Sequence, residues 1–296
     1  LRTGEDDLNS GKNTSFTQRL RDNFYFTVKG YQALFLEALT TGKFNQDMVE
    51  QHLVPMLEVL DRNKDVVSLL ITFTEEDVNI YNHSLQVGLL SYYIATWLGY
   101  SPNECYEISK AGYLHDIGKS RVRQSLRNRE QELTGEELEE MNRHTSYGYE
   151  IIRKSSGEEV TALVALQHHE REDGSGYPAR LRKEKIHPYA EIVAVANEYI
   201  TMSSPDASGV RLDLLTVLRN IYSLGFGKLS EKAVQALTSN LLPNFIGKKV
   251  KLSNGETATI VWNNPTDIFK PLVQIDEWQF RDLSRERHID LVQVFV

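Results

Sequence analysis

The spacing of apolar residues predicts helices along the first part of the chain. Between Phe16 and about Leu70, apolar residues recur every three or four positions, as on one face of a helix. Examples are Tyr31, Leu34, Phe35, Ala38, Leu53, Met56, Leu57 and Leu60. Gly42 and Asn63 are typical of helix ends. The first 15 residues are polar and include glycine, so we expect them to be loose.

Three capping signals predict where later helices begin. Each is a Ser or Thr followed three residues later by an acidic residue, at Thr74, Ser101 and Thr134. The hydroxyl can then accept a hydrogen bond from an unpaired N–H of the first turn. Periodicity predicts further helices over residues 158–170, 188–203, 212–223 and 230–242.

After Pro243 the helical spacing of apolar residues gives way to alternating apolar and polar residues, which is typical of β-strands. Asn254 and Gly255 lie between two alternating runs in "KKVKLSNGETATIVW", which predicts a hairpin, and "KPLVQIDEW" and "HIDLVQVFV" are strand-like. We therefore predict a mainly α protein in three parts. These are an N-terminal helical segment over 1–73, a helical bundle over 74–243, and a small antiparallel, barrel-like β module over 244–296.

Composition narrows the possible functions. The 296 residues carry a net charge of −8, and a net acidic chain is a poor non-specific binder of duplex nucleic acid. The single cysteine, Cys105, cannot form a disulfide within the chain, so we expect a cytoplasmic location. The most apolar stretch, residues 87–100, is too short and too polar to span a bilayer, so no membrane segment is expected within this chain.

Histidines concentrate in the predicted bundle. Five of the eight lie on or at the end of a predicted helix, namely His83, His115, His144, His168 and His169. Asp116 follows His115, and imidazole nitrogen together with carboxylate oxygen suits Fe, Mn or Zn. Any one of these histidines alone is better explained as an ordinary core or surface residue, but the ordered set favours a metal centre.

The adjacent pair His168 and His169 needs a helix end. Neighbouring residues on a continuous helix point about 100° apart, so the pair could reach one cavity only where the helix stops. The run "DGSGYP" follows directly, and two glycines and a proline cannot continue a helix. We therefore expect both imidazoles to face the same site.

At these residues the sequence resembles the HD-GYP family of the HD phosphohydrolase superfamily. The matching text is "NHSLQVGLLS", "AGYLHDIGKS", "LTGEELEEMNRHTSYGYEII", "VALQHHEREDGSGYP" and "IHPYAEIVAVAN", within roughly residues 74–205. The resemblance implies a helical HD-type bundle with two divalent metal ions, Fe or Mn, with Zn, Ni and Mg as alternatives. It also implies a role in bacterial signalling: hydrolysis of cyclic di-GMP to linear pGpG, and onward to GMP, by a metal-bridging hydroxide.

The resemblance also implies a role for particular residues. The metal ligands would be His83, His115, Asp116, His144, His168, His169 and the residue at position 197. Asp116 would bridge the two metals, and Lys119 would meet a phosphate oxygen. Gly176, Tyr177 and Pro178 would form the signature loop on the substrate side, although Tyr177 could instead simply pack. Glu170 would orient an imidazole, or else be a solvated charge at a helix end.

Two positions depart from the family pattern. Position 197 carries Asn in "AVAN" where the family has a metal-binding aspartate, and an amide oxygen is a weaker, uncharged ligand. Glu198 is adjacent but points about 100° away on a helix. Asn79 stands where members with three metals carry a glutamate, so we expect no third metal.

Two alternatives to a cyclic di-GMP phosphodiesterase stay open. One is a degenerate regulator that binds a cyclic dinucleotide or a partner protein without turnover, which Asn197 favours. The other is a phosphohydrolase that acts on another nucleotide. Signalling partners would bind at the signature loop or the β module, and a homodimer is a further expectation. The β module could equally be a packing appendage.

Overall fold

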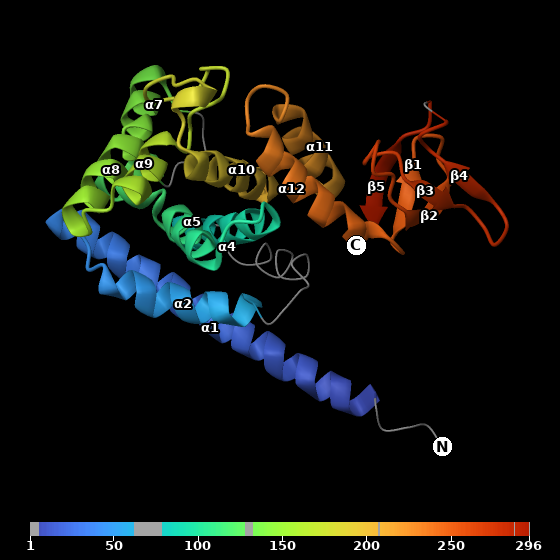
Figure 1. The fold of residues 1–296 in the computed structure, drawn as a ribbon, viewed down its shortest axis with the longest axis horizontal. Coiled ribbons are helices and arrows are strands. Elements are labelled where there is room, and N and C mark those ends of the chain that lie inside the picture. The colour runs from blue at the N-terminus through green and yellow to red at the C-terminus, as the bar shows by residue number, and fades with distance from the viewer. Residues whose placement is uncertain (1–5, 62–78, 128–132, 207, 287, 296) are drawn as a thin grey trace.

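Helices form most of the chain, and a small sheet follows them at the C-terminal end (Figure 1). This computed structural model describes residues 6–61, 79–127, 133–206, 208–286 and 288–295. The helices are α1 (Asp6–Thr41), α2 (Asp47–Asp61), α4 (Ile80–Trp97), α5 (Pro102–Leu114), η1 (Ile117–Arg121), α6 (Gln124–Arg127), α7 (Gly135–Asn142), α8 (His144–Ser155), α9 (Glu159–Gln167), η2 (Lys183–Lys185), α10 (Pro188–Ser203), α11 (Leu214–Leu224), α12 (Glu231–Leu241) and η3 (Leu242–Phe245).

Local sequence signals explain most of these helix boundaries. The capping boxes at Ser101 and Thr134 open α5 and α7 as predicted, whereas the one at Thr74 lies outside the described residues. The expectation of a loose N-terminal segment is wrong for residues 6–15, which belong to α1. Once the packed part of α1 has formed, each further helical residue adds a hydrogen bond without a new nucleation cost.

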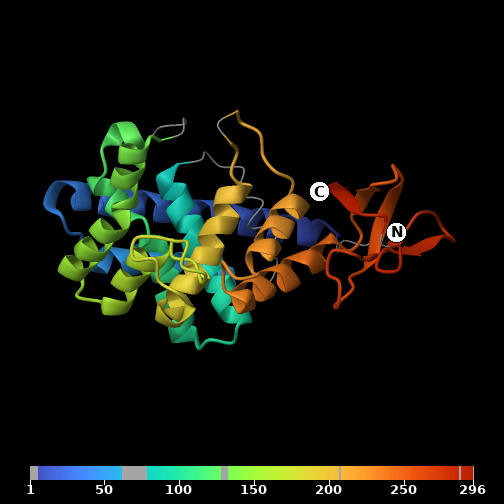
Figure 2. The same cartoon turned by 90° about the horizontal axis from the view of Figure 1, so that it is seen from above.

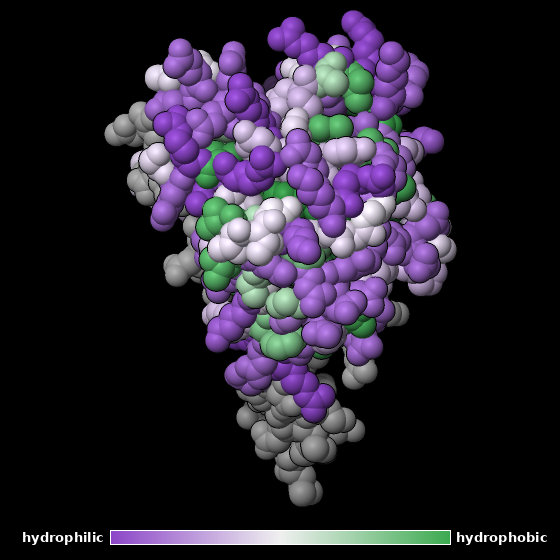
Figure 3. All heavy atoms as spheres, turned by 90° about the vertical axis from the view of Figure 1, so that its left-hand side faces the viewer, coloured by the Kyte–Doolittle hydropathy of each residue, from purple (hydrophilic) through white to green (hydrophobic). Residues whose placement is uncertain are grey.

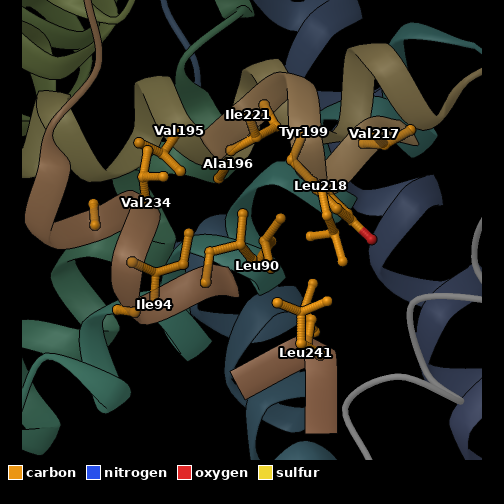
Figure 4. Close-up of a cluster of buried hydrophobic side chains, with 14 of the residues drawn as sticks. Leu90, Ile94, Val195, Ala196, Tyr199, Val217, Leu218, Ile221, Val234 and Leu241 are labelled. Carbon is orange, nitrogen blue, oxygen red and sulfur yellow. The ribbon is translucent and has the colours of Figure 1, made fainter. Parts of the chain in front are cut away.

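The central helix of the bundle is α4. Leu85 and Leu89 face a core shared with α1 and α2. Leu90 and Ile94 face a second core shared with α10, α11 and α12 (Figure 4). A helix that buries apolar residues on opposite sides must lie inside the protein. The middle of α4 is therefore buried, whereas His83 in its first turns is partly exposed, with 19% of its side chain accessible.

The C-terminal sheet continues the second core. Its strands are β1 (Lys249–Leu252), β2 (Thr257–Trp262), β3 (Leu272–Gln274), β4 (Phe280–Asp282) and β5 (Leu291–Phe295), in the antiparallel order β4-β3-β2-β1-β5. The predicted hairpin is present, with Gly255 at φ +88° between β1 and β2. Val250 and Ile260 on these strands join the core of α10–α12. The sheet lies at the opposite end of the molecule from α7 and α8 (Figure 2).

The predicted domain boundaries stay predictions. The first, at 73/74, falls in a segment outside the described residues. The second, at 243/244, falls within η3, where the helical core passes into the core of the sheet. Seen from the α7–α8 end, the surface is mostly hydrophilic, with apolar side chains in small groups and a notch at its upper edge (Figure 3). None of the helices in the described residues has the length and apolar character needed to cross a membrane.

Candidate metal centre

The predicted ligands come from the ends of several helices. His115 and Asp116 follow α5 directly, His144 opens α8, and His168 and His169 follow α9. His83 and Asn197 come from α4 and α10. All seven side chains approach one another, and six of them form two groups. The His83 group is His83, His115 and Asp116, and the His144 group is His144, His168 and His169; within each, the potential ligand atoms lie within 4.8 Å of one another.

A glycine allows the two groups to meet. A Cβ at Gly118 in η1 would lie 1.9 Å from the backbone oxygen of His144 and 2.3 Å from the backbone nitrogen of Gly148. Only glycine therefore lets η1 pack backbone to backbone against α8. This contact brings Asp116, just before η1, to the start of α8.

Asp116 lies between the groups and turns one oxygen to each. Its Oδ2 is 3.3 Å from Nε2 of His115 and 3.9 Å from Nε2 of His83. Its Oδ1 is 3.3 Å from Nε2 of His144 and 3.8 Å from Nε2 of His168. A carboxylate oriented in this way could serve one cation on each side.

Three of the imidazoles are oriented by backbone carbonyls. The Nδ1 atom contacts the carbonyl three residues earlier, at 2.6 Å for His115, 2.7 Å for His144 and 2.9 Å for His168. A carbonyl only accepts hydrogen bonds, so Nδ1 must carry the proton, and the neutral ring then presents an Nε2 lone pair. Hydrogen bonds of this kind are typical of metal-binding histidines.

The charge states of these groups also suit a cation. Burial and the nearby His115 lower the pKa of His83 to about 3, and burial lowers that of His144 to about 4. Burial lowers the pKa of His168 and of His169 well below its usual range, with neighbouring imidazoles adding to the effect. These rings are therefore neutral near pH 7, as metal ligands must be.

Two buried atoms at the centre lack a hydrogen-bond partner within the described chain. They are Nε2 of His115 and Oδ1 of Asp116, and these residues are 0% and 1% exposed. Burial alone would raise the pKa of Asp116, but His115 and Lys119 hold it well below its usual range, so the carboxylate is ionised. An ionised buried carboxylate and an unpaired imidazole nitrogen are what a divalent cation would satisfy.

Asn197, which departs from the family pattern, contacts one of the predicted metal ligands. Oδ1 of Asn197 lies 2.9 Å from Nε2 of His83. An amide oxygen accepts, so in this arrangement the Nε2 of His83 donates its proton to Asn197 rather than offering a lone pair to the centre. We therefore expect the His83 group to be the weaker of the two candidate metal positions.

Lys119 contacts a protein carboxylate here. Its Nζ atom is 2.6 Å from Oδ2 of Asp116 and the side chain is 25% exposed. The ammonium balances the buried charge of Asp116, and its position at the edge of the centre is compatible with the predicted contact to a phosphate oxygen. That contact stays a prediction.

The signature loop covers the His144 group. The ring of Tyr177 stacks on the ring of His169, with centroids 4.6 Å apart. The backbone N–H of Tyr177 donates to the His169 carbonyl at 3.2 Å. A Cβ at Gly176 would lie 2.3 Å from that same carbonyl, so the loop can approach only with glycine. The Tyr177–Pro178 peptide is cis. Tyr177 therefore packs against His169, in line with the alternative that it is a packing residue, and it also lines one side of the centre.

The predicted role of Glu170 is wrong. Its carboxylate accepts hydrogen bonds from the N–H groups of Ala179 at 2.7 Å and Leu181 at 2.8 Å. It contacts the loop rather than an imidazole, and at 2% exposure it is not a solvated charge either. A helix-end glutamate gives no sequence signal for which N–H groups it will meet, because those lie in a loop folded back over it.

One ion pair at the centre was missed from the sequence. Arg171 donates to Glu198 at 2.8 Å, and to the carbonyl of Glu170 at 3.0 Å. Glu198 therefore turns to Arg171, in line with its expected exclusion from the metal ligands. The only sequence signal for Arg171 is its place directly after the histidine pair.

Comparisons with known proteins agree with this site. The HD domain profile matches residues 47–213, more than half of the chain. A "Cyclic di-GMP phosphodiesterase" of Thermotoga maritima is 34% identical over 218 residues, covering 73% of this chain and 56% of that protein. The "Cyclic di-GMP phosphodiesterase response regulator RpfG" of Xanthomonas campestris pv. campestris is 37% identical over 160 residues, covering 53% of this chain and 42% of that protein.

A solved structure shares the fold. "Bd1817, a HDG"Y"P protein from Bdellovibrio bacteriovorus" superimposes with a TM-score of 0.60 at 18% identity, over 80% of this chain and 81% of that one. The chain belongs to the HD domain family, in its HD-GYP branch. It spans about half the length of the curated relatives it matches.

We expect Glu170→Ala to lower the free energy of unfolding by about 2 to 4 kcal/mol, because two backbone N–H groups of the loop lose a charged, buried acceptor. Chemical denaturation measures this change. The control is Glu184→Ala, an exposed glutamate of the same segment, which should change stability by less than about 0.5 kcal/mol. Equal effects of the two substitutions would contradict the assigned contact.

The lowered histidine pKa values predict how stability depends on pH. Below their ordinary value of 6.5, His83, His144, His168 and His169 take up protons in the unfolded chain while they stay neutral in the folded one. The free energy of unfolding of the metal-free protein should therefore fall as the pH drops from about 6.5 to about 4, by at most about 1.4 kcal/mol per pH unit for each group.

One glutamate acts in the opposite direction. Burial and Glu172 raise the pKa of Glu191 to about 7, so the folded protein holds a proton there that the unfolded chain releases. The stabilisation that Glu191 contributes grows as the pH falls, but it offsets the stability lost through only one histidine. Denaturation in a chelator between about pH 7 and pH 4 tests the sum. Stability that stays constant or rises over this window would refute the neutral-imidazole assignment, and His144→Gln should make the slope shallower.

Proposed function

We propose that this chain is a metal-dependent phosphodiesterase that hydrolyses cyclic di-GMP to linear pGpG, with further cleavage to GMP. The observation that carries this proposal is the position of Asp116, with one oxygen toward each of two imidazole groups. Two relatives are named cyclic di-GMP phosphodiesterases, which supports the choice of substrate. Since the matches cover about half of those proteins, the activity of this chain is an inference.

The donor set supports two divalent cations. His83, His115 and Asp116 would hold one, while His144, His168 and His169 with Asp116 would hold the other, in line with the donor atoms in each group. Nitrogen and carboxylate donors in this ratio suit Fe or Mn, with Zn, Ni and Mg as alternatives. When bound, such cations supply Lewis acidity that activates a water nucleophile near neutral pH and stabilises charge on the phosphate.

The protein side chains have separate tasks in this reaction. The backbone-bonded imidazoles keep their Nε2 atoms directed inward, so little rearrangement is needed on binding. Lys119, at the partly exposed edge, would turn from Asp116 to a non-bridging phosphate oxygen and stabilise its growing negative charge. Tyr177 would line the substrate side over His169 and limit access of water.

A second candidate is a regulator that binds a cyclic dinucleotide or partner protein without turnover. The hydrogen bond between His83 and Asn197 favours it, because it engages one ligand and leaves an uncharged amide where a carboxylate would bind a cation. Another substrate is also open, since a Vibrio cholerae relative, 29% identical over 159 residues, is named "3'3'-cGAMP-specific phosphodiesterase 2". Protein partners, a homodimer and a cytoplasmic location stay predictions.

We expect Asp116→Asn to abolish most metal binding and to lower phosphodiesterase activity by about 100-fold or more, since the shared negative charge is lost. Elemental analysis measures the metal. Chromatography of products from cyclic di-GMP, cyclic GMP-AMP and cyclic di-AMP with Mn²⁺, or with Fe²⁺ without oxygen, measures turnover. The control is Asp276→Asn in the β module, where the side chain accepts two backbone hydrogen bonds that an amide oxygen can keep.

Wild-type protein that binds metal but turns over none of these dinucleotides would favour the regulator. Metal content unchanged by Asp116→Asn would reject the role of Asp116 as shared ligand. Hydrolysis of cyclic GMP-AMP in preference to cyclic di-GMP would correct the substrate and leave the class of reaction in place.

Asn197→Asp should strengthen metal binding, because a charged carboxylate oxygen binds a divalent cation better than a neutral amide oxygen. We expect the occupancy of the weaker position, or the turnover rate, to rise about threefold or more. Titration of metal-free protein with Mn²⁺ measures the occupancy. The control is Asn264→Asp, which adds the same charge in a β-module turn where Asn264 Oδ1 already accepts from Thr266. A weaker or unchanged metal affinity would show that position 197 does not face a cation.

A further inference from the structure

The last turn of α5 is tied to the N-terminal helix. The hydroxyl of Tyr113 donates to the backbone carbonyl of Thr27 in α1 at 2.8 Å, and both residues are fully buried. Tyr113 lies two positions before His115, and the Nδ1 of His115 bonds to Gly112 in the same turn. The position of α1 therefore bears directly on the turn that presents His115 and Asp116.

Thr27 is also the point where α1 meets α2. Its hydroxyl donates to the carbonyl of His52 at 2.9 Å and to that of Asn23 at 2.7 Å. The helices approach closely here, since a Cβ at Gly30 would lie 2.3 Å from the ring of His52. That ring is held by stacking on Phe26, with centroids 4.5 Å apart, and by a 2.7 Å contact of its Nδ1 with a carbonyl of α2.

A second tyrosine extends this contact toward the centre. Tyr31 of α1 is fully buried, and its ring meets the ring of Tyr113 edge to face at 5.0 Å. Burial, and then the negative charge of Asp116, raise the pKa of Tyr31 above its usual range. The helix α1 also packs against η1, which begins directly after Asp116.

We propose that Tyr113 is a positioning residue through which α1 sets the metal affinity of the His115–Asp116 pair. The inference rests on the proposed function, because it takes these two residues as ligands. A shift of α1 moves the Thr27 carbonyl, and Tyr113 passes this shift to the end of α5. The 3.3 Å separation of His115 and Asp116 then changes, and with it the fit to a cation. The N-terminal helix is in this way a control element for the centre.

The first test removes the hydroxyl alone. Tyr113→Phe should raise the dissociation constant for Mn²⁺ by about threefold to tenfold, somewhat less than the loss of a group bonded directly to a ligand. It should also change the electron paramagnetic resonance spectrum of bound Mn²⁺. The control is Tyr106→Phe on the same helix, where the buried hydroxyl has no hydrogen-bond partner in the described chain. That variant should bind Mn²⁺ as wild type does.

The second test acts from α1. Gly30→Ala puts a methyl carbon 2.3 Å from the His52 ring, so α1, α2 or the ring must shift near Thr27, and it changes no residue of the centre. It should weaken Mn²⁺ binding in the wild-type background and have little further effect together with Tyr113→Phe, because both act through one contact. Measurements are made at a temperature where thermal melting shows every variant folded. If Tyr113→Phe is too unstable to measure, Gly30→Ala alone decides.

The outcomes distinguish failure of the proposed function from failure of this inference. Wild-type protein that binds no Mn²⁺, Fe²⁺ or Zn²⁺ would overturn the proposed function and this inference together. Wild-type protein that binds metal while Tyr113→Phe and Gly30→Ala leave both affinity and spectrum unchanged would overturn this inference alone. If the double variant raised the dissociation constant for Mn²⁺ by the product of the two single effects, the inference would also be overturned. Such independence would mean that the two substitutions act on the centre separately.

Discussion

A buried, ionised carboxylate between two groups of imidazoles is the constraint on which this structure depends. Asp116 is 1% exposed, and Lys119 alone cannot satisfy both of its oxygens, since the ammonium contacts Oδ2 and Oδ1 has no hydrogen-bond partner in the described chain. Isolating a charge in this way is costly unless a cation balances it. The helices of the bundle keep this arrangement in place, because its ligands lie at or near the ends of several of them.

The sequence predicted the members of the centre but not their mutual orientation. Residue type and order identified Asp116 and the five histidines, since those side chains suit metal ions and the "DGSGYP" run explains how His168 and His169 converge. The contact of Asn197 with His83 joins residues 114 positions apart, and no local pattern encodes it. The role of Glu170 was misassigned for the same reason, because its partners lie in a loop whose path depends on Gly176.

The fold was predictable wherever local signals were strong. Capping boxes located the starts of α5 and α7, and alternation with Asn254 and Gly255 located the β1–β2 hairpin. The strand β4 was missed, since only one of its three residues is apolar and they show no alternation of apolar and polar positions. Burial of the sheet against α10–α12, and packing of α1 against α5, could not be deduced, because such contacts depend on tertiary packing between distant parts of the chain.

The most direct test of the account is a crystal structure of the protein with Mn²⁺, with anomalous scattering recorded at the manganese absorption edge. The account predicts two anomalous peaks about 3.5 to 4 Å apart, one beside each oxygen of Asp116, with the peak near His83 and Asn197 the weaker. Peaks elsewhere, or none within coordination distance of Asp116, would contradict it.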